Sequence, residues 1–349
     1  MITTVALTLT LLGCGTPTTS TVLDERVNET GLGIAGGHSW LKLSTGELDR
    51  QMSGVVDAGA TWIRMDLDWS LIEHDRGRKD WSMTDRVVRS ARAHGLHVLA
   101  ILTYSPPWAR QDPGPGGNKV APYPALFGQF VADAVERYRD QIKHWEVWNE
   151  PNVTSFFAPL PHVGLYAQLL HQAATAVRTR QPGGQVLVGG LAPAADNGRD
   201  IAPSTFIERL YDLGSALDFD AVAVHPYSYP ELPSSPSRDN AFQNLTRLRA
   251  IMDARGDTSK RLWPTEFGAP TGTGARAVDE QTQAEILGGG LDLMAAMPNI
   301  GPVFVYSLID AGDDRQNLED NFGMLRRDYS AKPALAQVRA RAEVLRAGQ

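Results

Sequence analysis

Cysteine and lysine are the residue types that this sequence most clearly lacks. Its 349 residues include one cysteine, Cys14, which excludes an intramolecular disulfide. Lysine supplies 6 of the 33 basic residues, no lysine-rich run occurs, and the formal net charge is -7. A nucleic-acid partner needs a basic face that neutralises phosphates. The composition therefore excludes a lasting nucleic-acid partner and favours a neutral or weakly charged substrate.

A hydrophobic run long enough to span a membrane is also missing. The apolar, threonine-rich residues 1–13 fall short of the roughly 20 residues that a membrane helix needs, and suit a signal peptide. They end in Leu11-Leu12-Gly13-Cys14, which resembles a bacterial lipobox. The sequence predicts a signal and lipobox over residues 1–14 with Cys14 lipidated, a flexible tether over 15–30, and a secreted or envelope-anchored protein.

Membrane contact is expected only through that lipid. One feature departs from the lipobox pattern, since no Lys or Arg precedes Cys14. The alternative is an unstructured N-terminus with an incidental cysteine.

Three catalytic motifs are absent. Gly31-Leu32-Gly33 is not followed by the glycine spacing of a dinucleotide loop, and no G-x-S-x-G serine elbow occurs. His94 and His97 lack the H-E-x-x-H spacing of a zinc helix, as does Glu73-His74-Asp75. The sequence therefore predicts no cofactor, no metal and no Ser-His-Asp chemistry.

Short apolar runs alternate with amphipathic helical patterns along the rest of the chain. The apolar runs are 31–34, 61–67, 96–103, 144–149, 185–191, 219–225, 261–267 and 302–308. The helical patterns are 47–58, 81–94, 125–138, 165–180, 204–213, 241–254, 279–297 and 332–347. Continuous apolar strands are typical of buried parallel sheets, and eight such units match a closed barrel. We predict a single (β/α)8 TIM barrel over residues 31–349; an open doubly wound sheet is the alternative.

Two glutamates follow apolar runs at the predicted barrel mouth. Glu150 lies in Trp145-Glu146-Val147-Trp148-Asn149-Glu150-Pro151-Asn152, after the fourth run, and Glu266 lies in Trp263-Pro264-Thr265-Glu266-Phe267-Gly268, after the seventh. Strands four and seven stand on opposite sides of a barrel, so the two carboxyl groups are expected to face each other. A facing pair of this kind cleaves glycosidic bonds, because one group protonates the leaving oxygen while the other stabilises or attacks the anomeric carbon.

These motifs resemble the clan of retaining (β/α)8 glycoside hydrolases that contains the cellulase-like family 5 and the family 39 β-xylosidase-like enzymes. The resemblance covers nearly the whole chain after residue 30. It implies that Glu150 is the acid/base and Glu266 the nucleophile, and that Asn149 binds the sugar 2-hydroxyl. It further implies that Arg64, in Trp62-Ile63-Arg64, keeps Glu266 ionised.

The same resemblance extends to two further positions and to the C-terminal segment. Within Val224-His225-Pro226-Tyr227, it implies that Tyr227 hydrogen-bonds the nucleophile and that His225 lies beside the sugar. Residues 321–325 and 331–334 resemble the closing segment of these families. Two positions depart from family 5: residues 102–108 offer no histidine, and Tyr306 stands where strand eight usually presents a tryptophan.

Other polar and aromatic residues admit two interpretations each. Arg64, and the pair His225 and Tyr227, can instead form buried structural contacts. Asp66, Asp68 and Trp69 can contact sugar or cap a helix. Trp108, Phe156 and Phe157 can stack on sugar rings or pack on the barrel rim, whereas Trp40, Trp81 and Trp145 are expected in the core. The substrate-binding set is predicted as follows: Asn149, Arg64, His225, Tyr227, Tyr306, Trp108 and Asp66.

The expected function is a retaining hydrolase that cleaves a β-linked oligosaccharide or polysaccharide without a cofactor. Its expected partner is this carbohydrate. A non-hydrolytic carbohydrate-binding lipoprotein and a transglycosylase that uses the same residues are the alternatives.

Overall fold

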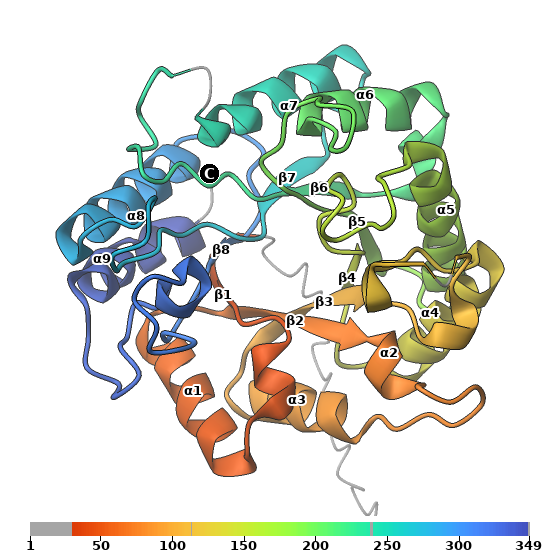
Figure 1. Cartoon of the computed structure of the whole chain (residues 1–349), viewed down its shortest axis with the longest axis horizontal. Coiled ribbons are helices and arrows are strands. Elements are labelled where there is room, and N and C mark those ends of the chain that lie inside the picture. Colours follow the sequence, from red (N-terminus) through yellow and green to blue (C-terminus); the bar gives the residue numbers. More distant parts are fainter. Residues whose placement is uncertain (1–29, 113, 238–239, 348–349) are drawn as a thin grey trace, which may run out of the picture.

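Eight parallel strands form the centre of the molecule in a computed structural model that describes residues 30–112, 114–237 and 240–347 (Figure 1). The strands are β1 Leu32–Ala35, β2 Trp62–Asp68, β3 His97–Thr103, β4 His144–Val147, β5 Gln185–Leu191, β6 Ala221–Val224, β7 Arg261–Pro264 and β8 Val303–Val305. They pair in the order β7-β6-β5-β4-β3-β2-β1-β8. The predicted (β/α)8 barrel is confirmed.

The barrel closes between β7 and β8 through single bridges rather than a full ladder. Leu262 pairs with Ile300 and Phe267 with Val305, both in parallel. The N–H of Phe267 donates to the carbonyl of Phe304 at 2.9 Å, and the N–H of Tyr306 donates back to the carbonyl of Phe267 at 2.9 Å. These bonds continue beyond the last residue of β7 and fix the chain around Glu266 against β8.

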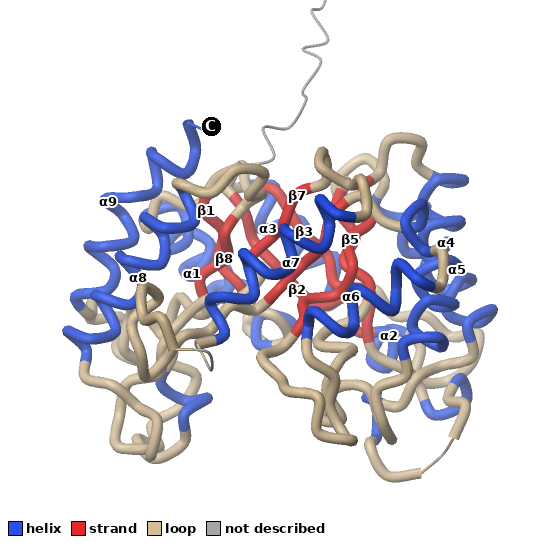
Figure 2. The backbone as a smooth tube through the Cα atoms, turned by 90° about the horizontal axis from the view of Figure 1, so that it is seen from above, coloured by secondary structure: helices blue, strands red, loops and turns tan. Residues whose placement is uncertain are grey.

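Helices surround the strands, so that the barrel forms an inner layer and the helices an outer one (Figures 1 and 2). They are α1 Thr45–Asp57, α2 Trp69–Ile72, α3 Ser82–Ala93, α4 Pro124–Tyr138, α5 Val163–Arg180, α6 Pro203–Asp212, α7 Asn244–Ala254, α8 Glu280–Ala295 and α9 Pro333–Ala347. Side-chain caps begin several of them; Ser44 accepts from the N–H of Glu47, and Asp279 from that of Thr282. No helix of the described chain combines the length and apolar character that crossing a membrane requires.

Large side chains fill the barrel interior below the mouth. The rings of Trp62 and Trp263 meet edge to face with centroids 5.5 Å apart, and His144 packs against both at 4.9 and 5.2 Å. Phe304 lies against Gly33, where a Cβ atom would come within 2.4 Å of the Phe304 ring. This packed floor leaves only the carboxyl ends of the strands open to a ligand.

Strand ends differ from the sequence prediction more than strand positions do. β4 ends at Val147 rather than at residue 149, because Trp148 takes a left-handed backbone conformation with φ 70° and leaves the ladder. β7 ends at Pro264 rather than at residue 267, and β8 spans Val303–Val305 rather than 302–308. The expected helix over 241–254 divides into a 3₁₀ turn, Ala241–Gln243, and α7.

The predicted leader, most of the predicted tether, and Cys14 lie outside the described residues. The lipid anchor and the extracytoplasmic location therefore stay predictions.

Candidate active site

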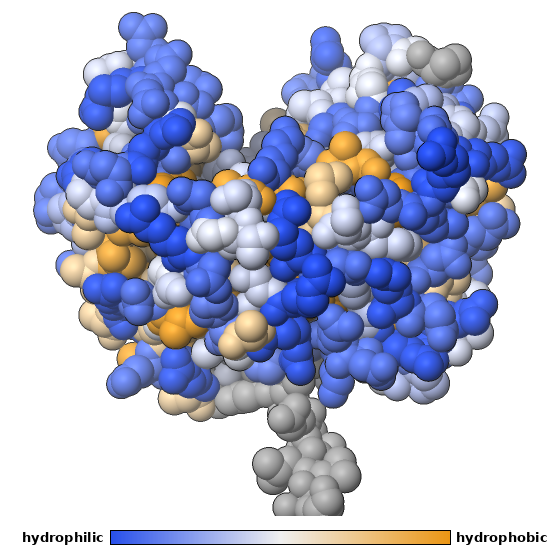
Figure 3. Space-filling view, turned by 90° about the horizontal axis from the view of Figure 1, so that it is seen from below, coloured by the Kyte–Doolittle hydropathy of each residue, from blue (hydrophilic) through white to orange (hydrophobic). Residues whose placement is uncertain are grey.

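A deep cleft opens at the barrel mouth, where the strands end. Its volume is about 1500 Å³, and both Glu150 and Glu266 line it. The space-filling view in Figure 3 shows the molecule hollowed between two lobes. The cleft thus lies where the loops after parallel barrel strands meet, the usual place for a site on this fold.

A strained turn after β4 carries Glu150. Trp148 and Glu150 both have positive φ, at 70° and 48°, an uncommon conformation for residues other than glycine. The N–H of Glu150 donates to the carbonyl of Gly190 in β5 at 3.0 Å, which secures the turn. Asn149 and Glu150 both face the cleft as a result. Strain of this kind persists only where the surroundings impose it, and it is common at functional sites.

Three groups surround the carboxylate of Glu266. Arg64 Nη1 lies 2.5 Å from its Oε1, the hydroxyl of Tyr227 donates to its Oε2 at 2.7 Å, and His225 Nδ1 lies 3.6 Å from Oε2. Burial acts to raise the pKa of Glu266, but His225, Arg64 and Tyr227 together outweigh burial and lower the pKa. Glu266 is therefore an ionised carboxylate at neutral pH, as a nucleophile requires.

Arg64 is itself held from below by Glu146, a residue that sequence reasoning missed. Arg64 Nε and Nη2 donate to the two carboxylate oxygens of Glu146, each at 2.8 Å, and Nη2 also donates to Asn149 Oδ1 at 2.8 Å. Both charged side chains are fully buried. The sequence carried a signal for this pair. Glu146 is the only acidic residue in β4, and its side chain points into the barrel, because the outward-facing positions on either side of it are Trp145 and Val147.

His225 joins the two glutamates. Its Nδ1 lies 2.9 Å from Glu150 Oε1, and its ring is fully buried. Its Nε2 has no hydrogen-bond partner among the described residues and faces Gly190, where a Cβ atom would come within 2.1 Å of that nitrogen. The ring therefore fits only because residue 190 has no side chain. His225 orients Glu150 rather than lining the cleft.

Glu150, His225 and Glu266 each offer one oxygen or nitrogen, and these atoms lie within 4.8 Å of one another. Three such groups at this spacing also form a donor set for a metal ion. However, Arg64 and Tyr227 already occupy the two oxygens of Glu266. A guanidinium cation beside this carboxylate repels a second cation, so the arrangement fits proton transfer and nucleophilic attack by a carboxylate better than metal binding.

One wall of the cleft is aromatic. Tyr306, Tyr229 and Phe322 line it, with ring centroids of Tyr306 and Phe322 at 5.1 Å and of Tyr229 and Phe322 at 5.5 Å. The hydroxyl of Tyr306 donates to Glu319 Oε2 at 3.2 Å. Burial raises the pKa of Glu319, with Tyr306 opposing that shift. Tyr306 thus offers a ring face whose orientation Glu319 fixes.

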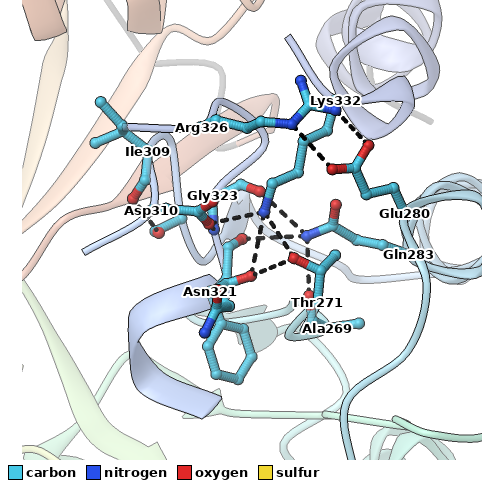
Figure 4. A network of polar contacts seen from close by, with 12 residues as sticks. Ala269, Thr271, Glu280, Gln283, Ile309, Asp310, Asn321, Gly323, Arg326 and Lys332 are labelled. Carbon is cyan, nitrogen blue, oxygen red and sulfur yellow. Dashed lines mark hydrogen bonds and ion pairs between the residues drawn. The ribbon is translucent and has the colours of Figure 1, made fainter. Parts of the chain in front are cut away.

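A buried polar network anchors the loops behind this wall (Figure 4). Lys332 Nζ donates to Asp310 Oδ1 at 2.7 Å and to Thr271 Oγ1 at 2.9 Å, which ties the loop after β8 to the loop after β7. Gln283 of α8 donates to the carbonyl of Ala269 at 2.9 Å. The network holds the segment that carries Phe322. Lys332 belongs to the closing segment that the sequence singled out.

Asp66 and Asp68 lie at the end of β2. Both line the cleft and both are buried. Asp68 caps α2 by accepting from the N–H of Ser70 at 2.9 Å, so the capping interpretation holds for Asp68. Asp66 makes no such bond and keeps its carboxylate toward the cleft.

Trp108 is not brought together with the other predicted site residues. Its indole N–H donates to the carbonyl of Glu73 at 3.0 Å, its ring packs edge to face on Trp69 at 5.4 Å, and it does not line the cleft. Phe157 is buried, whereas Phe156 lines the cleft. Of these three aromatic residues, only Phe156 is placed to contact a ligand in the cleft.

Comparison with solved structures finds the same fold in glycoside hydrolases. A family 39 glycoside hydrolase from Bacteroides cellulosilyticus WH2 matches with a TM-score of 0.73 and 23% identity over 91% of this chain. The fold is that of family 39 and family 5 glycoside hydrolases. A monomeric β-xylosidase from Caulobacter crescentus CB15 matches with a TM-score of 0.69 and 18% identity, over 88% of this chain and 67% of that chain. A family 5 subfamily 18 protein from Streptomyces cattleya, in complex with GlcNAc, matches with a TM-score of 0.69 and 18% identity, over 92% of this chain and 81% of that chain.

Sequence comparison reaches less far. No family model matches the chain. A chloroplastic galactolipid galactosyltransferase from Arabidopsis thaliana is 28% identical over 116 residues, and a β-glucosidase-like chloroplastic protein from Oryza sativa is 25% identical over 116 residues. Each match covers 30% of this chain and 18% of the plant protein. The chain also aligns with only 65% of the Bacteroides enzyme.

Proposed function

We propose that this protein is a retaining glycoside hydrolase that acts on a β-linked oligosaccharide or polysaccharide. The observation that carries the proposal is the pair Glu150 and Glu266, which present carboxylate oxygens within 4.8 Å of each other across the cleft. Retaining enzymes place their carboxyl groups about 5–5.5 Å apart, whereas inverting enzymes need about 6.5–9.5 Å to admit a water molecule. The spacing supports double displacement.

In the first step, the carboxylate of Glu266 attacks the anomeric carbon. Glu150 gives its proton to the leaving glycosidic oxygen, so that the bond from the anomeric carbon to that oxygen breaks as the bond to Glu266 forms. Arg64 and Tyr227 hold Glu266 by its two oxygens and orient it for attack. The lowered pKa of Glu266 keeps it ionised for this step.

In the second step, Glu150 removes a proton from water as the water oxygen bonds to the anomeric carbon. The bond to Glu266 breaks, and the sugar leaves with its original anomeric configuration. Asn149, whose amide oxygen is occupied by Arg64, keeps its NH₂ group for the sugar 2-hydroxyl. A hydrogen bond to that hydroxyl strengthens in the transition state.

Glu266→Ala with external azide tests the nucleophile. The variant is expected to lose hydrolysis of a 4-nitrophenyl β-glycoside and to recover turnover with azide, giving the α-glycosyl azide, because azide attacks from the face that Glu266 vacates. Glu150→Ala is the matched variant, and it is expected to give the β-glycosyl azide from the covalent intermediate. An unrescued Glu266→Ala variant, or an azide product of the opposite configuration, contradicts the assignment.

Transglycosylation is a second candidate, and one comparison favours it: the Arabidopsis protein that matches 30% of this chain is named a galactosyltransferase. In that reaction Glu150 removes a proton from a hydroxyl group of an acceptor sugar instead of from water. Product analysis separates the two, since a transglycosylase forms longer oligosaccharides from a single donor. A carbohydrate-binding protein without catalysis predicts saturable binding and no product at all.

A further inference from the structure

Asp66 is a buried carboxylate that the catalytic scheme does not use. It follows Arg64 by two residues in β2, so both side chains point to the barrel interior. It is 5% exposed, lines the cleft, and makes no hydrogen bond or ion pair with any residue in the described part of the chain. Burial, with Asp68 adding to it, raises the pKa of Asp66 to about 7. Among the described residues the carboxylate therefore has no partner, and it is open to a ligand that enters the cleft.

Lys119 is the complementary group. Its ammonium lies 3.3 Å above the ring of Tyr104 and 4.6 Å from that of Phe156, and it too lines the cleft. Burial lowers the pKa of Lys119 to about 8, while Asp66, Asp68 and Glu150 act to raise it. Within the described ranges, no carboxylate oxygen comes within 4 Å of its Nζ, and Nζ donates no hydrogen bond. The two aromatic rings therefore fix an ammonium whose three donors point toward no protein acceptor.

The neighbouring groups are already engaged. Asp68 Oδ1 accepts from the N–H and the hydroxyl of Ser70 at 2.9 and 2.5 Å, and His38 Nδ1 lies 3.7 Å from Asp68 Oδ2. Asn149 is held by Arg64. Asp66 and Lys119 thus stand out as one acceptor and one donor, of opposite charge, that face the cleft without meeting each other.

We infer that Asp66 and Lys119 bind hydroxyl groups of a neutral sugar ring next to the catalytic pair, and that they select against acidic and amino sugars. This inference rests on the proposed glycoside hydrolase function. A hydroxyl group both donates and accepts, so two hydroxyls of one ring satisfy Asp66 and Lys119 together. A sugar carboxylate pairs with Lys119 but leaves Asp66 and Asp68 facing a like charge. A sugar ammonium pairs with Asp66 but faces Lys119.

The first experiment compares 4-nitrophenyl β-glycosides of xylose, glucose, galactose, glucuronic acid and glucosamine. The wild type is expected to turn over at least one neutral glycoside and to favour it over the acidic and amino glycosides. Asp66→Asn and Lys119→Met are each expected to lower kcat/KM for that neutral glycoside by about 10- to 100-fold, because each removes a charged hydrogen-bonding partner. Asp66→Asn is also expected to raise the ratio of glucuronide to neutral turnover.

Asp292→Asn is the control. Asp292 lies in α8 and does not line the cleft, and Arg341 Nε and Nη2 donate to its two carboxylate oxygens, each at 2.8 Å. It is expected to change kcat/KM by less than about 3-fold, as surface substitutions away from a bound ligand do.

Monodeoxy versions of the preferred glycoside separate direct contact from a general electrostatic effect. One deoxy position is expected to cost the wild type about 10-fold or more and to cost Asp66→Asn nothing further. Equal losses in both proteins at every position overturn the contact. So does an unchanged ratio of glucuronide to neutral turnover in Asp66→Asn.

Binding is measured separately, so that failure of the catalytic proposal does not hide the answer. Saturation-transfer NMR with xylobiose and cellobiose is expected to show contact with the wild type and a weaker signal with Asp66→Asn and Lys119→Met. If no glycoside is hydrolysed but this loss appears, the site stands and the hydrolase proposal fails. If hydrolysis is found and the variants bind and react as the wild type does, the site is refuted and the hydrolase stands.

Discussion

Arg64 donates to the buried carboxylate of Glu146 through two hydrogen bonds of 2.8 Å, while its third nitrogen reaches Glu266 at 2.5 Å. One guanidinium thus links a carboxylate below the site to the carboxylate that is proposed to attack the substrate. The two planar bonds to Glu146 fix the direction in which Nη1 points. Glu146 and Arg64 together therefore set the position of the Glu266 carboxylate.

Glu146→Gln tests this coupling. The substitution keeps the side-chain shape but removes a buried charge from a pair, so we expect a loss of about 3 kcal/mol in the free energy of unfolding. We also expect kcat to fall, because Arg64 would no longer hold the Glu266 carboxylate in its position. Chemical denaturation and steady-state kinetics measure the two effects. Glu73→Gln is the matched control, since Glu73 is a buried carboxylate that binds Trp69 and Gly77 instead, and it should cost stability without lowering kcat.

Tyr227→Phe is expected to move the acid limb of the pH profile. The Tyr227 hydroxyl helps to lower the pKa of Glu266, so its removal lets that pKa rise toward the ordinary range. Because Glu266 must be ionised to attack, activity should then fall at a higher pH than in the wild type. The limb is read from kcat/KM against pH, which reports the free enzyme.

Tyr229→Phe provides the comparison for that profile. Tyr229 stands 5.7 Å from Tyr227, ring to ring, but its hydroxyl contacts neither glutamate in the described structure. Its profile should overlay that of the wild type. If the acid limb moved equally in Tyr229→Phe and Tyr227→Phe, the polarity of the aromatic wall, and not the hydrogen bond from Tyr227 to Glu266, would set the pH of that limb.

Tyr306 is expected to act through its ring face. Tyr306→Phe keeps the ring and loses only the bond of 3.2 Å to Glu319, so kcat/KM should change by less than about 5-fold. Tyr306→Ala removes the face and should lower kcat/KM by about 10-fold, because an aromatic contact contributes about 0.5–1.5 kcal/mol beyond its buried area. The same loss in both variants would assign the role to the hydroxyl instead.

Gly190→Ala should disable the site through His225. The added methyl group would approach His225 Nε2 within 2.1 Å and Thr265 Oγ1 within 2.8 Å. His225 must then shift from its position 2.9 Å from Glu150, and activity should fall by more than about 100-fold with the acid/base misplaced. Gly289→Ala in α8 meets no atom within 4 Å and should leave activity unchanged and stability equal or higher. A fully active Gly190→Ala variant would contradict the role of His225.

Lys332→Met is expected to destabilise the wall that carries Phe322. Lys332 is 2% exposed and pairs with Asp310 at 2.7 Å, so its loss leaves the partly buried carboxylate of Asp310 without a cation and should cost about 2 kcal/mol in the free energy of unfolding. The double variant Lys332→Met, Asp310→Asn removes both charges and should regain part of that loss. Denaturant titration measures both. A double variant less stable than the single one by the full cost of Asp310→Asn would show that the two sites act independently.

The sequence by itself predicted the barrel, which the structure confirms, and the two glutamates, which the structure brings together in one cleft. Alternating apolar runs and amphipathic helices are local patterns, and local periodicity follows directly from which face of an element is buried. Glu150 and Glu266 were found because each follows such a run, and the ends of parallel strands meet at one mouth. The exact strand ends were not found, because the left-handed turn at Trp148 is imposed by packing and has no glycine to announce it.

Only the tertiary structure decided which residues meet. Arg64 bonds to Glu146 and Glu266 across 82 and 202 positions of sequence, and no local pattern encodes a pairing at that separation. The same holds for Lys332 with Thr271, 61 positions away, and for the electrostatic effect of Asp66 on Lys119. Trp108 was predicted to face the cleft, but its ring packs against Trp69 instead. Residue type states what a side chain is able to do, whereas burial and the groups around it decide what it does.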